Sequence, residues 1–353
     1  MGNVSRIQKV MADANQGKEI TVGFIGGSIT MGSVATSPER CYAARVHAWW
    51  ESAFPKAKIN YVNAGIGATT SQFAVARAEE DLLAYSPDFV IVEFSVNDDA
   101  NAFFQETYEG LLRKILTHKC QPAVMIVNNM FYDTGVTAAE FHNRIGIAYD
   151  LPIISMKASI YEEIQQGIHQ IPDLTSDNLH PNDTGHALIA SKISHFLEVL
   201  WDAEAQGAEY KVPEPVTKNR YQNSVRLRNM DLEVKGQGFV RDNTSQNAIT
   251  EIFRKGWLAG EKGAWLETVV TGRNIAVQYR KTIHRPAPIA SISIDDGHKI
   301  ILDANFTEEW GDCLYLQTLA EGLDEGEHKV RVELTEATRN DASPFYLVSL
   351  IVS

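Results

Sequence analysis

Residues 21–33 read TVGFIGGSITMGS, and this stretch decides how the rest of the chain is interpreted. The run 21–25 is rich in β-forming residues and ends at Gly26 and Gly27, which allow a tight turn because glycine accepts backbone angles that a Cβ forbids. The turn presents Ser28 at the carboxyl end of a strand, where open α/β sheets place their ligands. Ser28 is therefore a candidate nucleophile whose own amide could stabilise an oxyanion, although a loop serine that caps a helix shows the same local pattern.

Strand-like and helix-like segments alternate regularly over the first 200 residues or so. This alternation indicates βαβ units and a parallel sheet with helices on both faces. The expected strands are 21–25, 58–62, 88–94, 123–127 and 153–154, and the expected helices are 4–15, 38–54, 71–85, 107–118, 137–149 and 183–201. We assign this α/β domain to residues 1–205.

The pattern changes after residue 205. Residues 206–224 are polar and contain two prolines, so we interpret them as a linker. From residue 225 the helical period disappears, and β-type runs recur between turn signals at 265–270, 275–279, 289–294, 299–302, 328–334 and 345–352. The sequence therefore predicts a second domain, 225–353, with an all-β sandwich or jelly-roll fold.

The overall composition limits the partners of the protein. The chain has 353 residues, 44% of them hydrophobic, which is enough for two domains with cores of their own. The net charge of −13 disfavours nucleic acid or an anionic membrane as the main partner. No apolar run has the length of a membrane helix, and residues 1–20 lack the apolar core of a signal peptide, so we expect a cytoplasmic protein. The three cysteines are far apart and are expected to be reduced thiols.

Two later segments follow strands at the same edge of the expected sheet as Ser28. Residues 65–69 are small, so that backbone amides can approach a ligand closely. The side-chain amide of Asn97 follows the buried strand 88–94 and could donate to a developing oxyanion. Asn97 could instead stabilise its own turn.

A third segment at this edge is the loop 176–182, which precedes the last helix of the α/β domain. His180 could accept the proton of Ser28, and Asp177 could fold back onto the imidazole and orient it. Each could also be an ordinary surface residue. Complementary polar groups that all follow strands of one sheet nevertheless favour a nucleophile, base and acid acting together.

Four short blocks of the sequence resemble the conserved blocks of the SGNH, or GDSL-type, hydrolases. They occur in the family's order within residues 18–201 and are 26–30 (GGSIT), 63–68 (NAGIGA), 96–98 (VND) and 177–181 (DNLHP). The resemblance implies a flavodoxin-like parallel sheet sandwiched by helices. It also implies Ser28 as nucleophile, His180 as base and Asp177 as the acid that orients the base.

The same resemblance implies an oxyanion hole. Its donors would be the amide of Ser28, the side chain of Asn97 and one backbone amide of the second block. Two departures from the family's pattern concern this hole: Gly27 replaces the usual aspartate before the serine, and Ala68 stands where the second block usually has glycine. An amide is still present there, but whether Gly67 or Ala68 points inward is left open.

The order of the two domains narrows the range of expected substrates. The β-domain is similar to carbohydrate-binding jelly rolls that stand beside polysaccharide-processing enzymes. The whole arrangement is similar to the two-domain acetylmannan esterases of gut bacteria. This resemblance implies the removal of O-acetyl groups from acetylated oligosaccharides, most of all manno-oligosaccharides, through an acetyl-serine and with no metal or organic cofactor.

Five residues are candidates for binding the sugar. Trp310 lies in a polar segment between strands, where an indole could stack on the apolar face of a pyranose, although a partly buried core tryptophan is the alternative. On the α/β domain, Tyr132, Asp133, Glu39 and Arg40 are expected to rim the pocket because of their positions after strands or near Ser28.

Other functions stay open at this point. A lipid, thioester or aryl esterase would keep the same triad but should have an apolar acyl tunnel, and the sequence shows no long apolar lid. A sugar-binding protein without catalysis is disfavoured by the complete set of triad residues. A metal-dependent hydrolase is disfavoured because the histidines do not cluster at ligand spacing. A linker and two apolar-rich domains also permit a homodimer.

Overall fold

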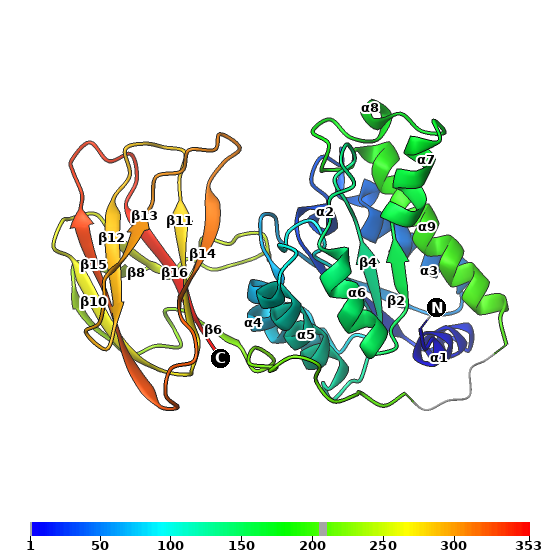
Figure 1. Cartoon of the computed structure of the whole chain (residues 1–353), viewed down its shortest axis with the longest axis horizontal. Coiled ribbons are helices and arrows are strands. Elements are labelled where there is room, and N and C mark those ends of the chain that lie inside the picture. The colour runs from blue at the N-terminus through cyan, green and yellow to red at the C-terminus, as the bar shows by residue number, and fades with distance from the viewer. Residues whose placement is uncertain (1, 205–209) are drawn as a thin grey trace. The chain divides into compact units, whose positions relative to one another are not determined.

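The structure is a computed structural model that describes residues 2–204 and 210–353 (Figure 1). The chain forms two compact units, Met1–Gln222 and Asn223–Ser353. The predicted domain boundary at residue 205 and the beginning of the predicted linker, 206–209, lie outside the described residues. The described part of that linker, up to residue 222, belongs to the first unit.

A parallel five-stranded sheet forms the centre of the first unit. Its strands have the spatial order β2-β1-β3-β4-β5, with the bounds β1 Ile20–Gly26, β2 Ile59–Gly65, β3 Phe89–Glu93, β4 Ala123–Asn128 and β5 Ile153–Ser155. This is the flavodoxin-like order, in which the chain reverses its direction of winding between β1 and β3 and leaves a crevice at the carboxyl ends of these strands. The predicted α/β fold is confirmed.

The first three strands end at the same level of the sheet. Gly26 of β1 lies opposite Gly65 of β2 on one side and opposite Glu93 of β3 on the other. The loops that follow β1, β2 and β3 therefore start side by side, which is what the alignment of the candidate site residues requires.

Helices cover both faces of the sheet (Figure 1). On one side α9 contacts both α1 and α3, and on the other α5 contacts both α4 and α6. The long helices are α1 Ser5–Asn15, α3 Tyr42–Ala53, α4 Ser71–Asp81, α5 Ala102–Leu116, α6 Ala139–Ala148 and α9 Asp183–Asp202. Shorter helical segments are α2 Ser28–Met31, η1 Pro38–Arg40, η2 Leu83–Tyr85, η3 Lys157–Tyr161, α7 Glu162–Gln165 and α8 Ile171–Leu174.

Helix α5 begins earlier than the sequence predicts. Its N-cap is Asn101, whose side chain accepts a hydrogen bond from Phe104 N at 3.0 Å. Such a cap satisfies one of the free amides of the first turn, so the helix starts directly after it.

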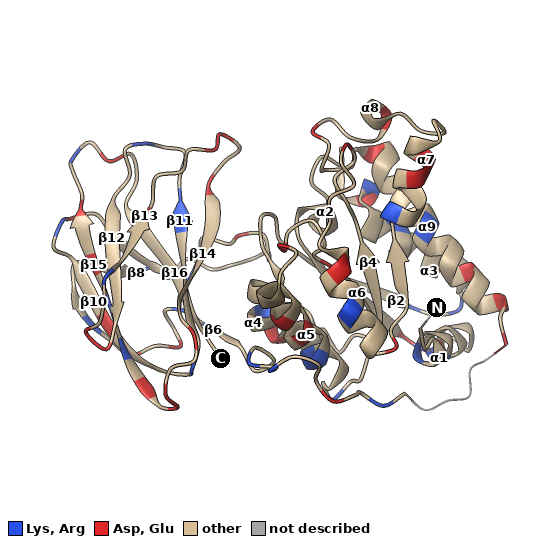
Figure 2. Ribbon diagram, viewed as in Figure 1, with Lys and Arg blue, Asp and Glu red and all other residues tan. Residues whose placement is uncertain are grey.

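The sheet is apolar on both faces, as expected for parallel strands that are covered by helices. Within its five described strands, Glu93 is the only charged residue, and the other charges lie on helices and loops (Figure 2). The core under α1, α3 and α9 contains large buried side chains, among them Phe24, Trp50, Phe54, Phe89 and Met125. Removing this apolar surface from water is the main stabilising contribution to such a fold.

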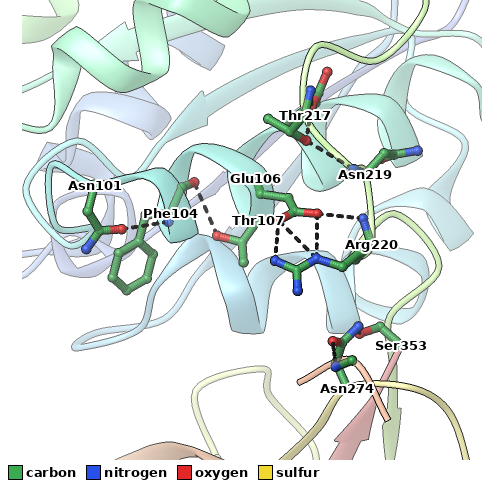
Figure 3. Close-up of polar contacts among 11 residues, drawn as sticks. Asn101, Phe104, Glu106, Thr107, Thr217, Asn219, Arg220, Asn274 and Ser353 are labelled. Atoms are coloured by element: carbon green, nitrogen blue, oxygen red, sulfur yellow. Dashed lines mark hydrogen bonds and ion pairs between the residues drawn. The ribbon is translucent and has the colours of Figure 1, made fainter. Parts of the chain in front are cut away.

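The end of the predicted linker is fixed to α5 by two buried glutamates. Glu106 accepts hydrogen bonds from the backbone N, Nε and Nη2 of Arg220 at 2.9, 3.0 and 2.7 Å (Figure 3). Glu109 accepts hydrogen bonds from Val216 N at 2.7 Å and Thr217 N at 2.8 Å. The described segment before residue 222 is therefore held on the α/β unit by charge-assisted hydrogen bonds.

The second unit consists of two antiparallel sheets, which confirms the predicted all-β domain. Their strand orders are β13-β12-β15-β10-β7 and β14-β11-β16-β9-β8, and β6 also pairs with β16. The bounds are β6 Val225–Leu227, β7 Val234–Gln237, β8 Val240–Arg241, β9 Trp257–Ala259, β10 Trp265–Thr271, β11 Ile275–Lys281, β12 Ile289–Ile294, β13 Ile300–Asp303, β14 Cys313–Ala320, β15 Glu327–Glu336 and β16 Phe345–Val352.

The sequence did not predict β6 to β9 or β14. The first four are too short to show an alternation of apolar and polar residues. Strand β14 lies at the edge of its sheet, and its burial does not alternate from residue to residue. The strands that were predicted are those with a clear apolar run or a clear alternation.

Candidate active site

Ser28 lies at the turn between β1 and α2 and is 8% exposed. The turn leaves no room for side chains at the two positions before it. A Cβ on Gly26 would lie 2.1 Å from Thr30 Oγ1, and a Cβ on Gly27 would lie 2.2 Å from Asn97 Oδ1. These contacts give a physical reason for glycine at residue 27, because any side chain there would displace Asn97.

The structure brings the three predicted triad residues together. Ser28 Oγ lies 2.8 Å from His180 Nε2, and His180 Nδ1 lies 2.6 Å from Asp177 Oδ2. When Nδ1 donates its proton to the carboxylate, Nε2 is the acceptor for the serine hydroxyl. This arrangement allows the imidazole to take a proton from Ser28 and Asp177 to stabilise the resulting imidazolium.

The loop that carries the base is held by Asp177. Its Oδ1 accepts hydrogen bonds from Leu179 N at 2.9 Å and His180 N at 2.7 Å, and Asn178 between them has a positive φ of 65°. Partial burial opposes ionisation of Asp177, but the hydrogen bonds from the His180 ring and from these two amides outweigh it and lower its pKa to about 2. The carboxylate is therefore ionised at neutral pH.

Asn97 lies beside the nucleophile turn, with its side-chain amide against Gly27. Its Oδ1 is buried and has no hydrogen-bond partner within residues 2–204 and 210–353. The nitrogen of the same amide carries the hydrogen-bond donors that an oxyanion would need. A nitrogen donor at this place suits the oxyanion role that the resemblance implies.

The second-block loop also approaches Ser28. A Cβ on Gly67 would lie 3.8 Å from Ser28 Cβ, whereas Ala68 is exposed and has a positive φ of 54°. Asn63 links this loop to α2, because its Nδ2 donates to Thr30 O at 2.8 Å and its Oδ1 accepts from Gly65 N at 2.9 Å. The structure thus places Gly67 next to the nucleophile.

Arg77 holds the ends of β1 and β2, from which the nucleophile turn and the second-block loop continue. This role was not predicted from the sequence. Its side chain is fully buried, and its Nη2 donates to Ala64 O at 2.8 Å and to Gly26 O at 3.4 Å. Its Nη1 pairs with Asp81 at 3.1 Å. The guanidinium therefore ties the ends of β1 and β2 together, and the only sequence signal was an arginine among the apolar positions of a helix.

Glu93 is a second buried charged residue beside the turn that sequence reasoning missed. It ends β3 opposite Gly26 and is 0% exposed. Burial raises the pKa of Glu93 to about 7, although a hydrogen bond from Ser95 Oγ at 3.3 Å favours the carboxylate. A charged residue at the end of the otherwise apolar run DFVIVEF was the available signal.

The predicted rim residues have different surroundings. Arg40 Nη1 forms a salt bridge with Asp183 Oδ2 at 2.8 Å, and both Glu39 and Asp133 are exposed. Tyr132 corrects a prediction: it is 2% exposed, and its side chain packs in the hydrophobic core. Its ring is therefore not available to a sugar.

Trp310, in the second unit, is 59% exposed, so the core alternative for this residue is wrong. Its indole meets the ring of Phe306 edge to face, with 5.0 Å between the centroids. The pair leaves an aromatic surface in contact with solvent.

Within residues 2–204 and 210–353, no group of three or more histidine, cysteine, aspartate or glutamate side chains could hold a metal ion. In the same part of the chain, the apolar stretches of the helices are too short or too polar to cross a bilayer.

Comparison with known proteins gives matches over both the first unit and the whole chain. The model of the GDSL-like Lipase/Acylhydrolase family matches residues 24–188, a range that contains all three triad residues. The crystal structure of a two-domain esterase (CEX) active on acetylated mannans, co-crystallised with mannopentaose, is 50% identical. That match covers 100% of this chain and 95% of the other, with a TM-score of 0.96.

More distant relatives match the first unit. An acetylxylan esterase of Geobacillus stearothermophilus is 25% identical over 211 residues, which are 50% of this chain and 94% of that protein. The thioesterase 1/protease 1 of Escherichia coli, also named a lysophospholipase, is 25% identical over 189 residues, which are 51% of this chain and 84% of that protein. From its motifs, its fold and these matches, the first unit of the chain contains a domain of the GDSL-like lipase/acylhydrolase family.

Proposed function

We propose that this protein is a serine esterase that removes O-acetyl groups from acetylated oligosaccharides, most of all manno-oligosaccharides. The observation that carries the proposal is the hydrogen-bonded series of Ser28, His180 and Asp177 at the crevice of the sheet. The proposed substrate is supported by the 50% identity, over the full chain, to an esterase active on acetylated mannans.

In the proposed reaction, Ser28 Oγ attacks the carbonyl carbon of the acetyl group while His180 Nε2 takes the hydroxyl proton. The tetrahedral oxyanion accepts hydrogen bonds from the Ser28 amide, Asn97 Nδ2 and the amide of Gly67 or Ala68. Each such donor typically lowers the barrier by about 3 kcal/mol. Collapse of the intermediate breaks the bond to the sugar oxygen, which receives the proton from His180 and leaves an acetyl-serine.

Water completes the cycle by the same steps. His180 takes a proton from water as the oxygen attacks the acetyl-serine, and the oxyanion hole again holds the negative oxygen. The intermediate then releases acetate, and Ser28 regains its proton. Asp177, with a pKa of about 2, stays ionised throughout and stabilises the imidazolium form of His180.

The all-β unit contributes sugar binding in this proposal, as a carbohydrate-binding module. The exposed indole of Trp310 is a suitable platform for the apolar face of a pyranose. Glu39 and Asp133 are exposed and can offer carboxylates to sugar hydroxyls. Arg40 is a weaker candidate, because its guanidinium already binds Asp183.

One observation favours a second function, hydrolysis of esters or thioesters with long acyl chains. The thioesterase 1/protease 1 of Escherichia coli matches the first unit at 25% identity. The same three residues would carry out the chemistry, so the two functions differ in the substrate alone.

Rates of ester hydrolysis separate these functions, followed as acetate release from the oligosaccharides and as p-nitrophenol release from the aryl ester. Purified protein would be incubated with acetylated manno-oligosaccharides, acetylated xylo-oligosaccharides and a long-chain p-nitrophenyl ester, each also with Ser28→Ala. We expect preference for the manno-oligosaccharides and loss of release in the variant. Preference for the long-chain ester would replace the proposed substrate and leave the triad, whereas full activity of Ser28→Ala would contradict the triad.

The cytoplasmic location that the sequence predicts and the homodimer that it permits stay predictions. Fractionation of the source cells tests the first, and sedimentation velocity of the purified chain tests the second.

A further inference from the structure

A second pair of histidine and carboxylate lies beside the oxyanion donor and takes no part in the triad. His142 Nε2 is 3.0 Å from Asp98 Oδ2, and both side chains are fully buried. Asp98 directly follows Asn97 in the chain. The amides of both residues donate to Phe94 O at 3.0 Å, so Asn97 and Asp98 belong to one tight turn at the end of β3.

The other oxygen of Asp98 reaches the second-block loop. Asp98 Oδ1 accepts a hydrogen bond from the backbone N of Ser71 at 2.9 Å. Ser71 is the first residue of α4 and follows closely on Gly67 and Ala68. A single carboxylate thus connects the turn that carries Asn97 with the loop that carries the candidate backbone donors.

His142 holds this carboxylate from the opposite side. It lies on α6, and its ring stacks on that of Tyr108 from α5, with 3.7 Å between the centroids and 5° between the planes. The imidazole is therefore fixed by ring packing as well as by its bond to Asp98. A buried carboxylate without such a partner is unfavourable, which makes the pair a rigid constraint on its surroundings.

We infer that the Asp98–His142 pair is a positioning element for the oxyanion hole. It holds the turn so that the amide of Asn97 stays against Gly27, with its nitrogen available to the developing oxyanion. This inference rests on the proposed esterase function and adds residues to its machinery that touch neither the substrate nor Ser28.

The first test is Asp98→Asn, measured with p-nitrophenyl acetate and with acetylated manno-oligosaccharides. Asparagine keeps the volume and the acceptor for Ser71 N but changes the bond to His142. Because an oxyanion donor acts in the transition state more than in the bound substrate, we expect kcat to fall about 10- to 100-fold and KM to change less than about threefold. A wild-type kcat would overturn the inference.

A double-mutant cycle shows whether Asp98 acts through Asn97. Asn97→Ala alone should lower kcat by about 100-fold or more. In that background Asp98→Asn should cost less than about a further twofold, because the group that it positions is already absent. A loss as large as in the wild-type background would mean that Asp98 acts independently of Asn97 and would overturn the inference.

Two variants of His142 give a matched comparison. His142→Phe keeps a ring against Tyr108 but removes the donor to Asp98, and we expect kcat to fall about tenfold. His142→Gln can place its amide nitrogen near the position of Nε2 and should stay within about threefold of wild type. A loss in His142→Gln that equals or exceeds the loss in His142→Phe would mean that the donor to Asp98 does not matter, and it would contradict the positioning role.

A further control separates positioning from stability. Ile145 is fully buried on the same helix, and Ile145→Val removes a methylene group without touching the polar pair. Active sites would be counted by titration with an organophosphate, so that unfolded protein does not lower the apparent kcat. We expect Ile145→Val to lower the melting temperature and leave kcat per active site unchanged. If it lowers kcat as much as Asp98→Asn, the inference fails.

The outcomes distinguish this inference from the proposed function. A wild-type protein that hydrolyses p-nitrophenyl acetate but releases no acetate from the oligosaccharides would contradict the proposed substrate. The double-mutant cycle of Asn97 and Asp98, measured with p-nitrophenyl acetate, would still test the inference. Normal deacetylation by the wild type together with a wild-type kcat for Asp98→Asn would contradict the inference alone. A wild-type protein that hydrolyses neither ester would contradict both.

Discussion

The two halves of the active site are built in different ways. The nucleophile turn, 26–30, is buried and is shaped by close packing, with a Cβ on Gly27 only 2.2 Å from Asn97 Oδ1. The base loop, 175–182, is more exposed and is shaped by polar bonds, since the carboxylate of Asp177 holds two backbone amides and the ring of His180. One half is shaped by excluded volume, and the other is shaped by polar bonds, those of the Asp177 carboxylate among them.

This difference teaches which kind of change each half tolerates. In the turn, one added methyl group must displace a neighbour, because the space is already filled. In the loop, a side chain of the same shape can keep the backbone bonds, and the loss lies in charge and proton position. Substitutions that alter volume should therefore damage the turn, and substitutions that alter charge should damage the loop.

The largest effect that tests this contrast is expected from Asp177→Asn. The amide oxygen can still accept from Leu179 N and His180 N, so the loop should keep its shape, but the ionised partner of His180 is lost. Loss of the corresponding aspartate in serine hydrolases lowers kcat by about 10⁴-fold. We expect a loss of this order in acetate release, with a crystal structure of the variant showing an unchanged loop. A disordered loop, or a kcat within tenfold of wild type, would contradict the contrast.

The next effect is expected from Gly27→Ala, which adds one methyl group to the turn. Asn97 must move, so we expect kcat to fall about 10²- to 10³-fold, as for the loss of one oxyanion donor. Gly260→Ala is the control, because a Cβ there meets no atom within 4 Å. Wild-type turnover by Gly27→Ala, measured with p-nitrophenyl acetate, would show that the turn can adapt and that packing does not define this half.

Much of the site could be predicted because its signals are local. Gly26 and Gly27 after an apolar run mark a tight turn at a strand end, and that end fixes the position of Ser28 in a parallel sheet. Asp177 and His180 occur in one loop, so their bond needs no long-range contact. The start of α5 was predicted too late, although Asn101 before the helix was a readable N-cap signal.

The residues that could not be predicted depend on contacts between distant segments. Arg77 is buried because the carbonyl groups of Gly26 and Ala64 converge on it, and neither contact follows from helical periodicity. Tyr132 follows a strand, as binding residues often do, but the path of its loop places the ring in the core. Arg40 is paired with Asp183, which lies far along the sequence.

Glu93, beside the buried nucleophile turn, makes the stability of the fold depend on pH. Burial raises its pKa to about 7 from the ordinary 4.5, so the unfolded chain loses this proton at a lower pH than the folded protein does. The stabilising contribution is fully present below about pH 4.5 and is lost as the pH rises to about 7, by on the order of 3 kcal/mol. Glu93→Gln should abolish this decline in thermal unfolding between these pH values. The exposed Glu51→Gln is the control, and a variant that keeps the wild-type pH slope would show that Glu93 is not its source.

The smallest effect is expected at the exposed support of the base half. Asp183, at the start of α9, accepts hydrogen bonds from Thr36 N at 2.9 Å, Thr36 Oγ1 at 2.7 Å and Arg40 Nη1 at 2.8 Å. Arg40→Ala removes one of three bonds, and its side chain is 56% exposed, so solvent and salt already weaken the pair. We expect kcat to change less than about twofold, and Asp183→Ala, which removes all three bonds, to have the larger effect.

The same variant decides between two roles for Arg40. If it only ties the segment after α2 to α9, Arg40→Ala should change KM equally little for p-nitrophenyl acetate and for acetylated manno-oligosaccharides. If it binds sugar, as the sequence suggested, KM should rise several-fold for the oligosaccharide alone, because the aryl ester has no sugar to lose contact with it. A KM that rises for the oligosaccharide alone would assign Arg40 to the substrate-binding surface and not to the support of the base loop. An exposed, polar residue such as Arg40 can both tie two segments together and bind a substrate. The packed turn around Gly27 has no room for a second role.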